Sequence, residues 1–247
     1  MNNIKILGIT ISSLGLDELR AVLLKYLKTD GSKQIVTPNP EFCVRAGRDF
    51  EFRNILNKAD LAIPDGIGIK LAGLYLGTPI KKRITGIRLV RELCQIASDQ
   101  KKKVYFLGAT NKTALEAARN LKSKYSDMKV VGAENEYSVF GKMKDDKVVK
   151  KINQKKADIL FVAFGAPKQE KWIYYNLPKM KSVKIAVGVG GAFDYYSGNV
   201  KRAPSLFRNI GLEWLYRLIR QPWRIKRIFT AIMVFPVKLF FKRKNHA

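Results

Sequence analysis

The chain has 247 residues, which suits one large α/β domain with an appendage or two small domains. Hydrophobic residues make up 47% of it, and its 18 glycines and 9 prolines are ordinary proportions that exclude a disordered or low-complexity chain. Lys and Arg number 47 against 20 Asp and Glu, so the net charge is +27 and an anionic partner is expected.

The first hundred residues alternate short apolar runs, typical of strands, with longer stretches that carry apolar side chains at a helical period. Strands are predicted over residues 5–11, 34–37 and 61–64. Helices are predicted over residues 16–28, 41–59, 68–76 and 86–99. Pro38 and Pro40 end the second strand, and a break in the second helix is expected near Arg48 and Asp49.

The same alternation continues to about residue 190. Strands are predicted over residues 104–108, 129–132, 159–164 and 184–189, and helices over residues 113–125, 145–156 and 168–175. Buried apolar strands joined by helices indicate a parallel sheet. The sequence therefore predicts an α/β fold, a Rossmann-like, mostly parallel sheet sandwiched by helices over residues 1–200, followed by a helical, basic appendage over residues 201–247.

Ligands of such sheets bind beyond the carboxyl ends of the strands. Four predicted strand ends place Gly or Pro beside polar side chains, where backbone amides can approach a phosphate. They are residues 37–41 (Thr-Pro-Asn-Pro-Glu), 64–68 (Pro-Asp-Gly-Ile-Gly), 165–170 (Gly-Ala-Pro-Lys-Gln-Glu) and 188–194 (Gly-Val-Gly-Gly-Ala-Phe-Asp). Taken singly, each is explained by a tight turn, because these residue types dominate turns.

Taken together, the strand ends and two motifs of the appendage resemble a known family. The two further motifs are Lys-Arg-Ala-Pro at 201–204 and Gly-Leu-Glu-Trp, followed by Arg-Gln-Pro-Trp-Arg, within 211–224. The sequences of these motifs and their order along the chain are similar to those of the WecG/TagA/CpsF glycosyltransferases, from near the N-terminus to about Arg227. The resemblance is strongest to the TagA branch. It implies an inverting, metal-independent enzyme that moves N-acetylmannosamine from its UDP derivative to the 4-hydroxyl of N-acetylglucosamine on undecaprenyl diphosphate.

The resemblance also implies which residues act. Asp65 matches the family's proposed general base, which takes the proton of the acceptor hydroxyl. Thr37 and Asn39 match a pair that lines the catalytic pocket, and we expect Thr37 to take part in catalysis. On residue type alone, Asp65 is equally explained as an Asx turn or as the N-cap of the following helix.

Three further residues match positions that bind the donor. Arg83 matches an arginine near the donor phosphates, although a solvated basic run over residues 81–83 is the alternative. Gln169 and Asp194 match positions associated with the nucleotide, and Asp194 could accept a hydrogen bond from the uracil or the ribose.

The UDP leaving group needs a metal ion or cationic side chains to stabilise its charge. The chain has no Asp-x-Asp pair and its one histidine is His246, so neither a metal site nor a cofactor is expected. Four arginines spaced three, four and three residues apart would form one stripe on a continuous helix: Arg217, Arg220, Arg224 and Arg227. If Pro222 interrupts that helix, the arginines can still converge on the diphosphate.

The appendage mixes cations and aromatic residues. Residues 201–247 hold twelve Lys and Arg and one acid, Glu213. This make-up is typical of an amphipathic helix at an anionic membrane surface. Its longest uncharged stretch, residues 228–237, is shorter than the about twenty residues that a spanning helix needs. We therefore expect membrane docking, and the family resemblance implies that the appendage also completes the active site. The alternative is that the aromatic residues pack as ordinary core.

Location and assembly follow from weaker signals. Cys43 and Cys94 lie in stretches with helical patterns, and the N-terminus leads straight into a strand-like segment. Both features favour a cytoplasmic protein, peripheral on the inner face of the membrane. The apolar helix faces are compatible with a homo-oligomer.

Other functions remain open at this stage. The high charge and interleaved aromatic residues also suit a nucleic-acid binder, but no zinc-finger, RNP-like or helix-turn-helix pattern is present, so nucleic acid is not expected. A nicotinamide dehydrogenase is disfavoured because Phe193 replaces the third glycine of its motif and no helix is predicted after Gly191. Within the family, the uronic acid of N-acetylmannosamine, glucose and galactose remain possible donor sugars.

Overall fold

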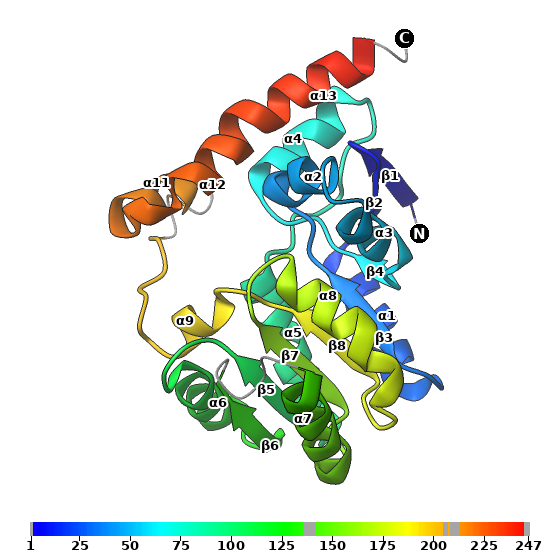
Figure 1. Cartoon of the computed structure of the whole chain (residues 1–247), viewed down its shortest axis with the longest axis vertical. Helices are drawn as coiled ribbons and strands as arrows, with labels where there is room; N and C mark the ends of the chain where they lie inside the picture. The colour runs from blue at the N-terminus through cyan, green and yellow to red at the C-terminus, as the bar shows by residue number, and fades with distance from the viewer. Residues whose placement is uncertain (1, 136–141, 205–206, 208–212, 245–247) are drawn as a thin grey trace.

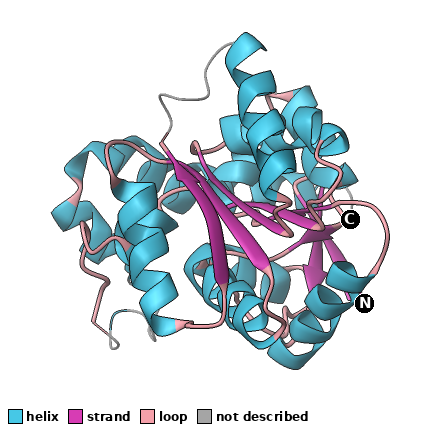
Figure 2. Ribbon diagram, turned by 90° about the horizontal axis from the view of Figure 1, so that it is seen from below, coloured by secondary structure: helices cyan, strands magenta, loops and turns pink. Residues whose placement is uncertain are grey.

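The computed structural model describes residues 2–135, 142–204, 207 and 213–244. Within these residues, a parallel sheet of six strands lies between layers of helices, which confirms the predicted α/β fold (Figure 1; Figure 2). In their order across the sheet, the strands are β4 (Leu61–Ala62), β3 (Lys33–Val36), β8 (Ile185–Gly188), β7 (Ile159–Ala163), β5 (Lys103–Gly108) and β6 (Lys129–Glu134). Every strand predicted from residue 34 onward is present.

Helices connect the strands and cover both faces of the sheet. Those of the body are α1 (Leu16–Lys28), α2 (Pro40–Ala46), α3 (Phe50–Lys58), α4 (Ile67–Tyr75), α5 (Gly86–Asp99), α6 (Thr113–Lys124), α7 (Lys142–Lys155), α8 (Lys168–Asn176) and α9 (Ala192–Tyr196). The break predicted near Arg48 and Asp49 is confirmed. Asp49 caps α3 by accepting a hydrogen bond from the backbone N–H of Phe52 at 2.9 Å.

The central strands are buried on both faces, so their side chains belong to two different cores. Phe106 and Phe161 pack with α1, α5, α6 and α9 on one face of the sheet. Tyr105 and Leu160, the preceding residues, pack with α7 and α8 on the other face. A third core joins Val36 of β3 to α2, α3 and α4. The sheet is thus a rigid support for the loops at its carboxyl edge.

The single strand predicted over residues 5–11 is wrong. The segment is an antiparallel hairpin of β1 (Asn2–Ile6) and β2 (Ile9–Ser13), separate from the main sheet. Leu7 and Gly8 form its two-residue turn with φ of 48° and 87°, the backbone that such a tight hairpin requires. The apolar pattern does mark strand structure, but Gly8 reverses the chain and folds both halves onto the third core.

The prediction that no helix follows Gly191 is also wrong. Gly190 turns the chain with φ of 47°, and the short helix α9 begins at Ala192. Phe193 anchors this helix because its ring is fully buried against Phe106, with 5.5 Å between the centroids.

The appendage is helical, as predicted, and Pro222 does interrupt it. Helix α11 (Glu213–Arg220) ends before a 3₁₀ turn at Pro222–Arg224. Helix α12 (Ile225–Phe229), a π-helical turn at Thr230–Val234 and α13 (Phe235–Lys244) then form one continuous rod, which we call the C-terminal helix. Pro236 lies inside this rod and has no backbone N–H to donate, and the π-helical turn ends two residues before it.

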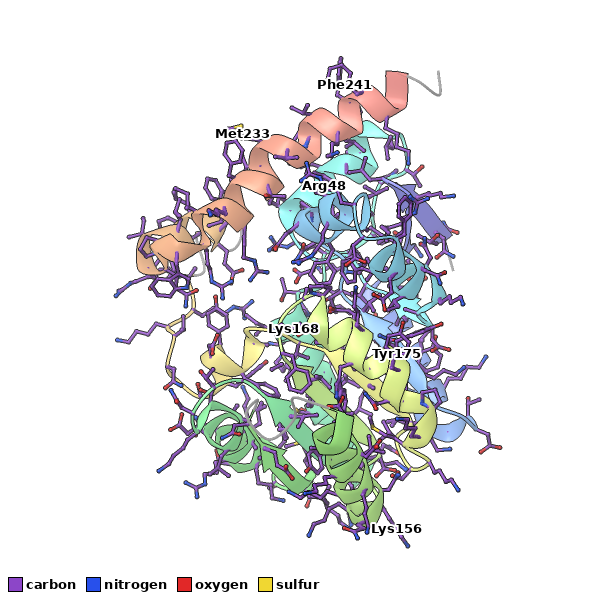
Figure 3. All side chains as sticks on the ribbon, in the orientation of Figure 1. Arg48, Lys156, Lys168, Tyr175, Met233 and Phe241 are labelled. Atoms are coloured by element: carbon purple, nitrogen blue, oxygen red, sulfur yellow. The ribbon has the colours of Figure 1, made fainter. Side chains whose placement is uncertain are left out.

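The C-terminal helix lies across α2 and α4 of the body (Figure 1). Phe235 and Leu239 are buried in the third core, so some of its apolar residues pack as ordinary core. Met233 and Phe241 point away from the body and are more than half exposed (Figure 3). No helix among the described residues is long and apolar enough to cross a membrane. The domain boundary at residue 200 stays a prediction.

Candidate active site

Loops that follow four neighbouring strands form the centre of the site. Because β4, β3, β8 and β7 are adjacent and parallel, their carboxyl ends meet at one edge of the sheet. A polar cavity of about 170 Å³ lies there, lined by Thr37, Asp65, Gln169 and the loop at 188–191. The structure therefore brings together the four strand ends that the sequence singled out.

Asp65 is held at the rim of this cavity by backbone contacts. Its N–H donates to the carbonyl of Pro38 at 2.9 Å, which joins the loops after β3 and β4. Its Oδ2 accepts a hydrogen bond of 3.4 Å from the N–H of Gly86, the first residue of α5. The positive end of the α5 dipole stabilises a negative carboxylate there. Gly66, not Asp65, is the N-cap of α4, so the capping interpretation of Asp65 is wrong.

Thr37 and Asn39 stand beside Asp65 on the loop after β3. Thr37 is buried and lines the polar cavity. Asn39 is the N-cap of α2, and its Oδ1 accepts from the N–H of Phe42 at 3.0 Å. Since this bond fixes the orientation of the carboxamide, the Nδ2 group of Asn39 is the one that can donate to a ligand.

Gln169 connects two loops of the polar cavity. Its Oε1 accepts hydrogen bonds from the backbone N–H groups of Gly165 at 3.1 Å and Gly190 at 3.0 Å. Its Nε2 donates to Glu170 Oε1 at 2.7 Å, and the side chain is buried. These contacts make Gln169 a positioning residue that fixes the cavity wall, in addition to lining it.

Glu170 lies directly behind Gln169 and is fully buried. Desolvation raises the pKa of its carboxyl to about 7, although the hydrogen bond from Gln169 opposes this shift. Gly188 packs against both side chains. A Cβ at this position would lie 2.6 Å from Gln169 Nε2 and 2.8 Å from Glu170 Oε1. A side chain at the end of β8 would therefore displace Gln169 or Glu170 from these contacts.

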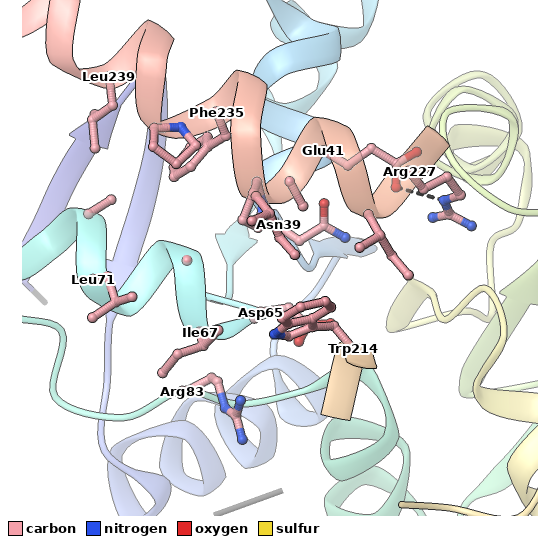
Figure 4. A pocket seen from close by; sticks show the side chains of 18 of the residues that line it. Asn39, Glu41, Asp65, Ile67, Leu71, Arg83, Trp214, Arg227, Phe235 and Leu239 are labelled. Carbon is pink, nitrogen blue, oxygen red and sulfur yellow. Dashed lines mark hydrogen bonds and ion pairs between the residues drawn. The ribbon is translucent and has the colours of Figure 1, made fainter. Parts of the chain in front are cut away.

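A larger cavity of about 710 Å³, which we call the apolar groove, opens between α4 and the appendage (Figure 4). Leu71 and Tyr75 of α4 form one wall, and Ile232 and Phe235 of the C-terminal helix lie opposite. Asp65 lines this groove as well as the polar cavity, so the two cavities adjoin at this residue.

The four predicted arginines of the appendage do not form one stripe, because the helix breaks at Gln221. Arg224 and Arg227 line both cavities where they meet. Arg227 also pairs with Glu41 at 2.7 Å, which ties the C-terminal helix to α2. Arg220 is exposed, and its guanidinium lies 5.8 Å from the centroid of the Tyr216 ring. The side chain of Arg217 falls outside the described part of the chain, as do Gly211, Leu212 and His246.

Arg83 is half-buried and lines the groove, whereas its neighbours Lys81 and Lys82 are exposed. Arg83 is thus less exposed than the rest of its basic run, and its contact with the donor phosphates stays a prediction. Arg83 also lines a third cavity of about 190 Å³, together with Arg88, Arg91 and Arg202. This concentration of arginines makes the third cavity suited to anions.

Sequence reasoning missed several residues of the site. Glu213 lines both cavities, and its carboxylate lies 3.6 Å from Arg202. Its signal was available, because it is the one acid among the twelve cations of residues 201–247. Tyr195, not Asp194, lines the polar cavity. Asp194 is half-buried on α9, and its proposed contact with the nucleotide stays a prediction.

No metal-binding cluster is seen in the described ranges: no three His, Cys, Asp or Glu side chains come together. The cationic groups near Asp65 are Arg83, Arg224 and Arg227. Charge on a phosphate in these cavities would therefore meet guanidinium groups.

A Rossmann-like sheet with a carboxylate and arginines at its carboxyl edge is typical of α/β proteins that bind anionic ligands. The sequence model of the glycosyl transferase WecG/TagA/CpsF family matches residues 4–247. The chain belongs to this family and is a glycosyltransferase, which confirms the resemblance seen in its motifs.

Characterised relatives are similar over most of their length. A Bacillus spizizenii protein named N-acetylglucosaminyldiphosphoundecaprenol N-acetyl-beta-D-mannosaminyltransferase is 36% identical over 206 residues, 83% of this chain and 78% of the relative. Proteins of the same name from Bacillus subtilis and Staphylococcus aureus are each 35% identical, over 79% and 83% of this chain and 75% and 78% of the relative. These similarities lend no support to the nucleic-acid alternative.

Proposed function

We propose that this glycosyltransferase moves N-acetylmannosamine from UDP-N-acetylmannosamine to the 4-hydroxyl of N-acetylglucosamine on undecaprenyl diphosphate, with inversion and without a metal ion. The observation that carries the proposal is the position of Asp65, which lines both the polar cavity and the apolar groove. A donor and a lipid-linked acceptor can thus approach one base from two sides. The relatives' names contain this sugar and this acceptor.

Asp65 acts as the general base in this reaction. The acceptor oxygen attacks the anomeric carbon and forms the new C–O bond while its proton passes to the Asp65 carboxylate. The bond from the anomeric carbon to the phosphate oxygen breaks on the opposite face, so the configuration inverts and UDP leaves with the electron pair. The N–H of Gly86 holds the carboxylate in place for this step.

The donor occupies the polar cavity. Thr37 and the Nδ2 group of Asn39 provide hydrogen-bond donors for sugar hydroxyls, and Thr37 stands close to the reacting carbon. Tyr195 on α9 contacts the nucleoside, with Asp194 accepting from the uracil or the ribose.

Arginines take the charge of the leaving diphosphate. Arg224 and Arg227 reach the junction of the cavities from the appendage, and Arg83 lines the groove side from the loop before α5. Guanidinium groups bind phosphate oxygens in bidentate geometry and keep their charge at any working pH. The appendage therefore completes the active site.

The appendage also docks the enzyme on the inner face of the cell membrane. Its exposed apolar residues recur every four positions on the C-terminal helix and form what we call the outer stripe: Ile225, Phe229, Met233, Val237 and Phe241. Each of these side chains is more than half exposed. Lysines and arginines flank the stripe, as expected at anionic headgroups. Cys43 and Cys94 are free thiols, in keeping with a reducing compartment.

A panel of UDP-sugars tests the donor assignment. The purified enzyme is incubated with an N-acetylglucosamine diphosphate lipid and one donor at a time, and the products are identified by mass spectrometry. We expect a disaccharide product from UDP-N-acetylmannosamine. A product formed instead from the corresponding uronic acid, glucose or galactose donor would replace the assigned sugar, and no product from any donor would refute the proposed function.

A further inference from the structure

The apolar groove is larger and more hydrophobic than a sugar acceptor needs. Its volume of about 710 Å³ lies within the range of about 300–1,000 Å³ for cavities that bury whole drug-sized ligands. Asp65 and Arg227 lie towards one side of the groove, and Leu71 and Leu239 lie towards the other (Figure 4). On that other side, the groove is lined by hydrophobic side chains of α4 and the C-terminal helix.

The side walls of the groove are apolar side chains that stay exposed in the described part of the chain. Leu71 and Phe240 are 56% and 55% exposed, on facing elements, and Tyr75 is 39% exposed. Large apolar residues exposed together in a concave site mark a binding surface. Phe235 and Leu239, on the C-terminal helix opposite α4, also line the groove and are buried.

Close packing sets the width of the groove. A Cβ at Gly68 of α4 would lie 2.7 Å from Pro40 Cγ of α2, and the Phe235 ring is 3.9 Å away. The pair of Arg227 and Glu41 fixes the other end of the C-terminal helix on α2. The groove is therefore a built feature of the fold.

We propose that this groove binds the first isoprene units of the acceptor's polyprenyl chain, an inference that rests on the proposed function. Arg83, which lines this groove but not the polar cavity, matches the acceptor's diphosphate, whereas Arg224 and Arg227 serve the leaving diphosphate of the donor. The apolar walls match the hydrocarbon that directly follows the acceptor's diphosphate. The lipid is thus recognised as part of the substrate, in addition to anchoring it in the membrane.

The groove face and the outer stripe are different faces of one helix. Residues 228, 232, 235 and 239 face the groove, whereas Met233 and Phe241 point away from the body (Figure 3). The C-terminal helix can therefore contact the membrane with one face and the prenyl chain with the other. This separation allows a test in which groove and membrane effects are measured apart.

The first measurement is how kcat/KM depends on the length of the acceptor's lipid chain, in solution without vesicles. The full chain is assayed with N-acetylglucosamine diphosphate esters carrying either an ethyl or a farnesyl group, below the micelle concentration. We expect kcat/KM to be at least about tenfold higher for the farnesyl ester, because the groove buries many of its carbons. Transfer to both esters at equal efficiency would overturn the groove proposal and leave the proposed function intact. No transfer to either ester from any UDP-sugar would contradict the proposed function itself.

Matched variants then locate the lipid. Leu71→Gln and Phe240→Gln place a polar group on an exposed groove wall. Each should abolish most of the preference for the farnesyl ester over the ethyl ester. Leu115→Gln changes an exposed leucine on α6 and should behave as wild type. Phe241→Gln, on the outer face next to Phe240, should keep the preference.

Direct binding gives a second readout. Trp214 lines the groove, so farnesyl diphosphate should change the protein's tryptophan fluorescence at lower concentration than inorganic diphosphate, and this difference should vanish in Leu71→Gln. An unchanged farnesyl preference in both groove variants, or an equal loss in Phe241→Gln, would overturn the proposal.

Discussion

The polar cavity and the apolar groove meet at Asp65 but are held together in different ways. The polar cavity consists of backbone loops joined by hydrogen bonds, such as those from Gly165 and Gly190 to Gln169. The apolar groove depends on side-chain packing of the C-terminal helix, chiefly through Phe235. Hydrogen-bonded loops on a sheet fix reacting groups closely, whereas a packed terminal helix is easier to displace. We therefore expect chemistry to depend on the first region and acceptor binding on the second.

Asp65→Asn should have the largest effect. It keeps the shape of the side chain and removes the base, so kcat should fall by about 10³-fold while UDP binding, measured by calorimetry, stays within about twofold. Asp17→Asn, an exposed change on α1, serves as the control. Turnover near that of wild type in Asp65→Asn would remove Asp65 from the mechanism and leave the junction of the two cavities without its proposed role.

Arg224→Ala should follow, with a loss of about 10²-fold in kcat/KM, because a guanidinium at the junction of the cavities stabilises the leaving diphosphate. Arg224→Lys should recover part of the loss, since lysine keeps the charge but not the bidentate geometry. Arg220→Ala is the matched control. Arg220 lies exposed over Tyr216, so its loss should cost little. Equal losses at positions 220 and 224 would show that the appendage rearranges when substrate binds.

The contrast between the two regions also explains what the sequence can predict. A strand end with Gly, Pro and a polar residue is recognised from a few consecutive residues. The sequence alone is therefore enough to single out Thr37, Asn39 and Asp65. The arginine stripe was predicted from helical spacing, but it depended on whether Pro222 breaks the helix, and packing of the C-terminal helix decided which arginines reach the site.

Features made by distant contacts escaped sequence reasoning. The apolar groove arises because α4 and the C-terminal helix face each other, about 160 residues apart in the chain, and neither has a pattern that names its partner. The hairpin at residues 2–13 was missed because Leu7 and Gly8 continue an apolar run, and only positive φ angles reveal the turn. Gln169 matched a nucleotide position, yet its contacts show that it also joins two loops.

Glu170 offers a way to loosen the polar cavity without touching substrate. Burial raises its pKa from 4.5 to about 7, so the folded protein binds a proton that the unfolded chain releases. The protonated carboxyl therefore contributes to the free energy of unfolding. This contribution, on the order of 3 kcal/mol, is fully present below about pH 4.5 and is lost as the pH rises through about 7. Glu170→Gln should flatten this decline in Tm.

Activity separates two variants at this position. Glu170→Gln retains an acceptor for Gln169 Nε2 and should keep kcat within a few fold, whereas Glu170→Ala should lower kcat by about tenfold because Gln169 loses its support. A pH dependence of Tm that is the same in wild type and Glu170→Gln would show that another group titrates.

The outer stripe should give the smallest effects, since each of its side chains contributes separately to membrane contact. Phe229→Ser or Met233→Ser should weaken co-sedimentation with anionic vesicles by about five- to tenfold, because each removes one exposed apolar side chain from the interface. The farnesyl preference measured without vesicles should persist in both variants, unlike in Leu71→Gln. Leu115→Ser controls for the loss of an exposed apolar side chain elsewhere. Unchanged vesicle binding in a variant that carries both changes would contradict docking through this stripe and shift attention to the cations beside it.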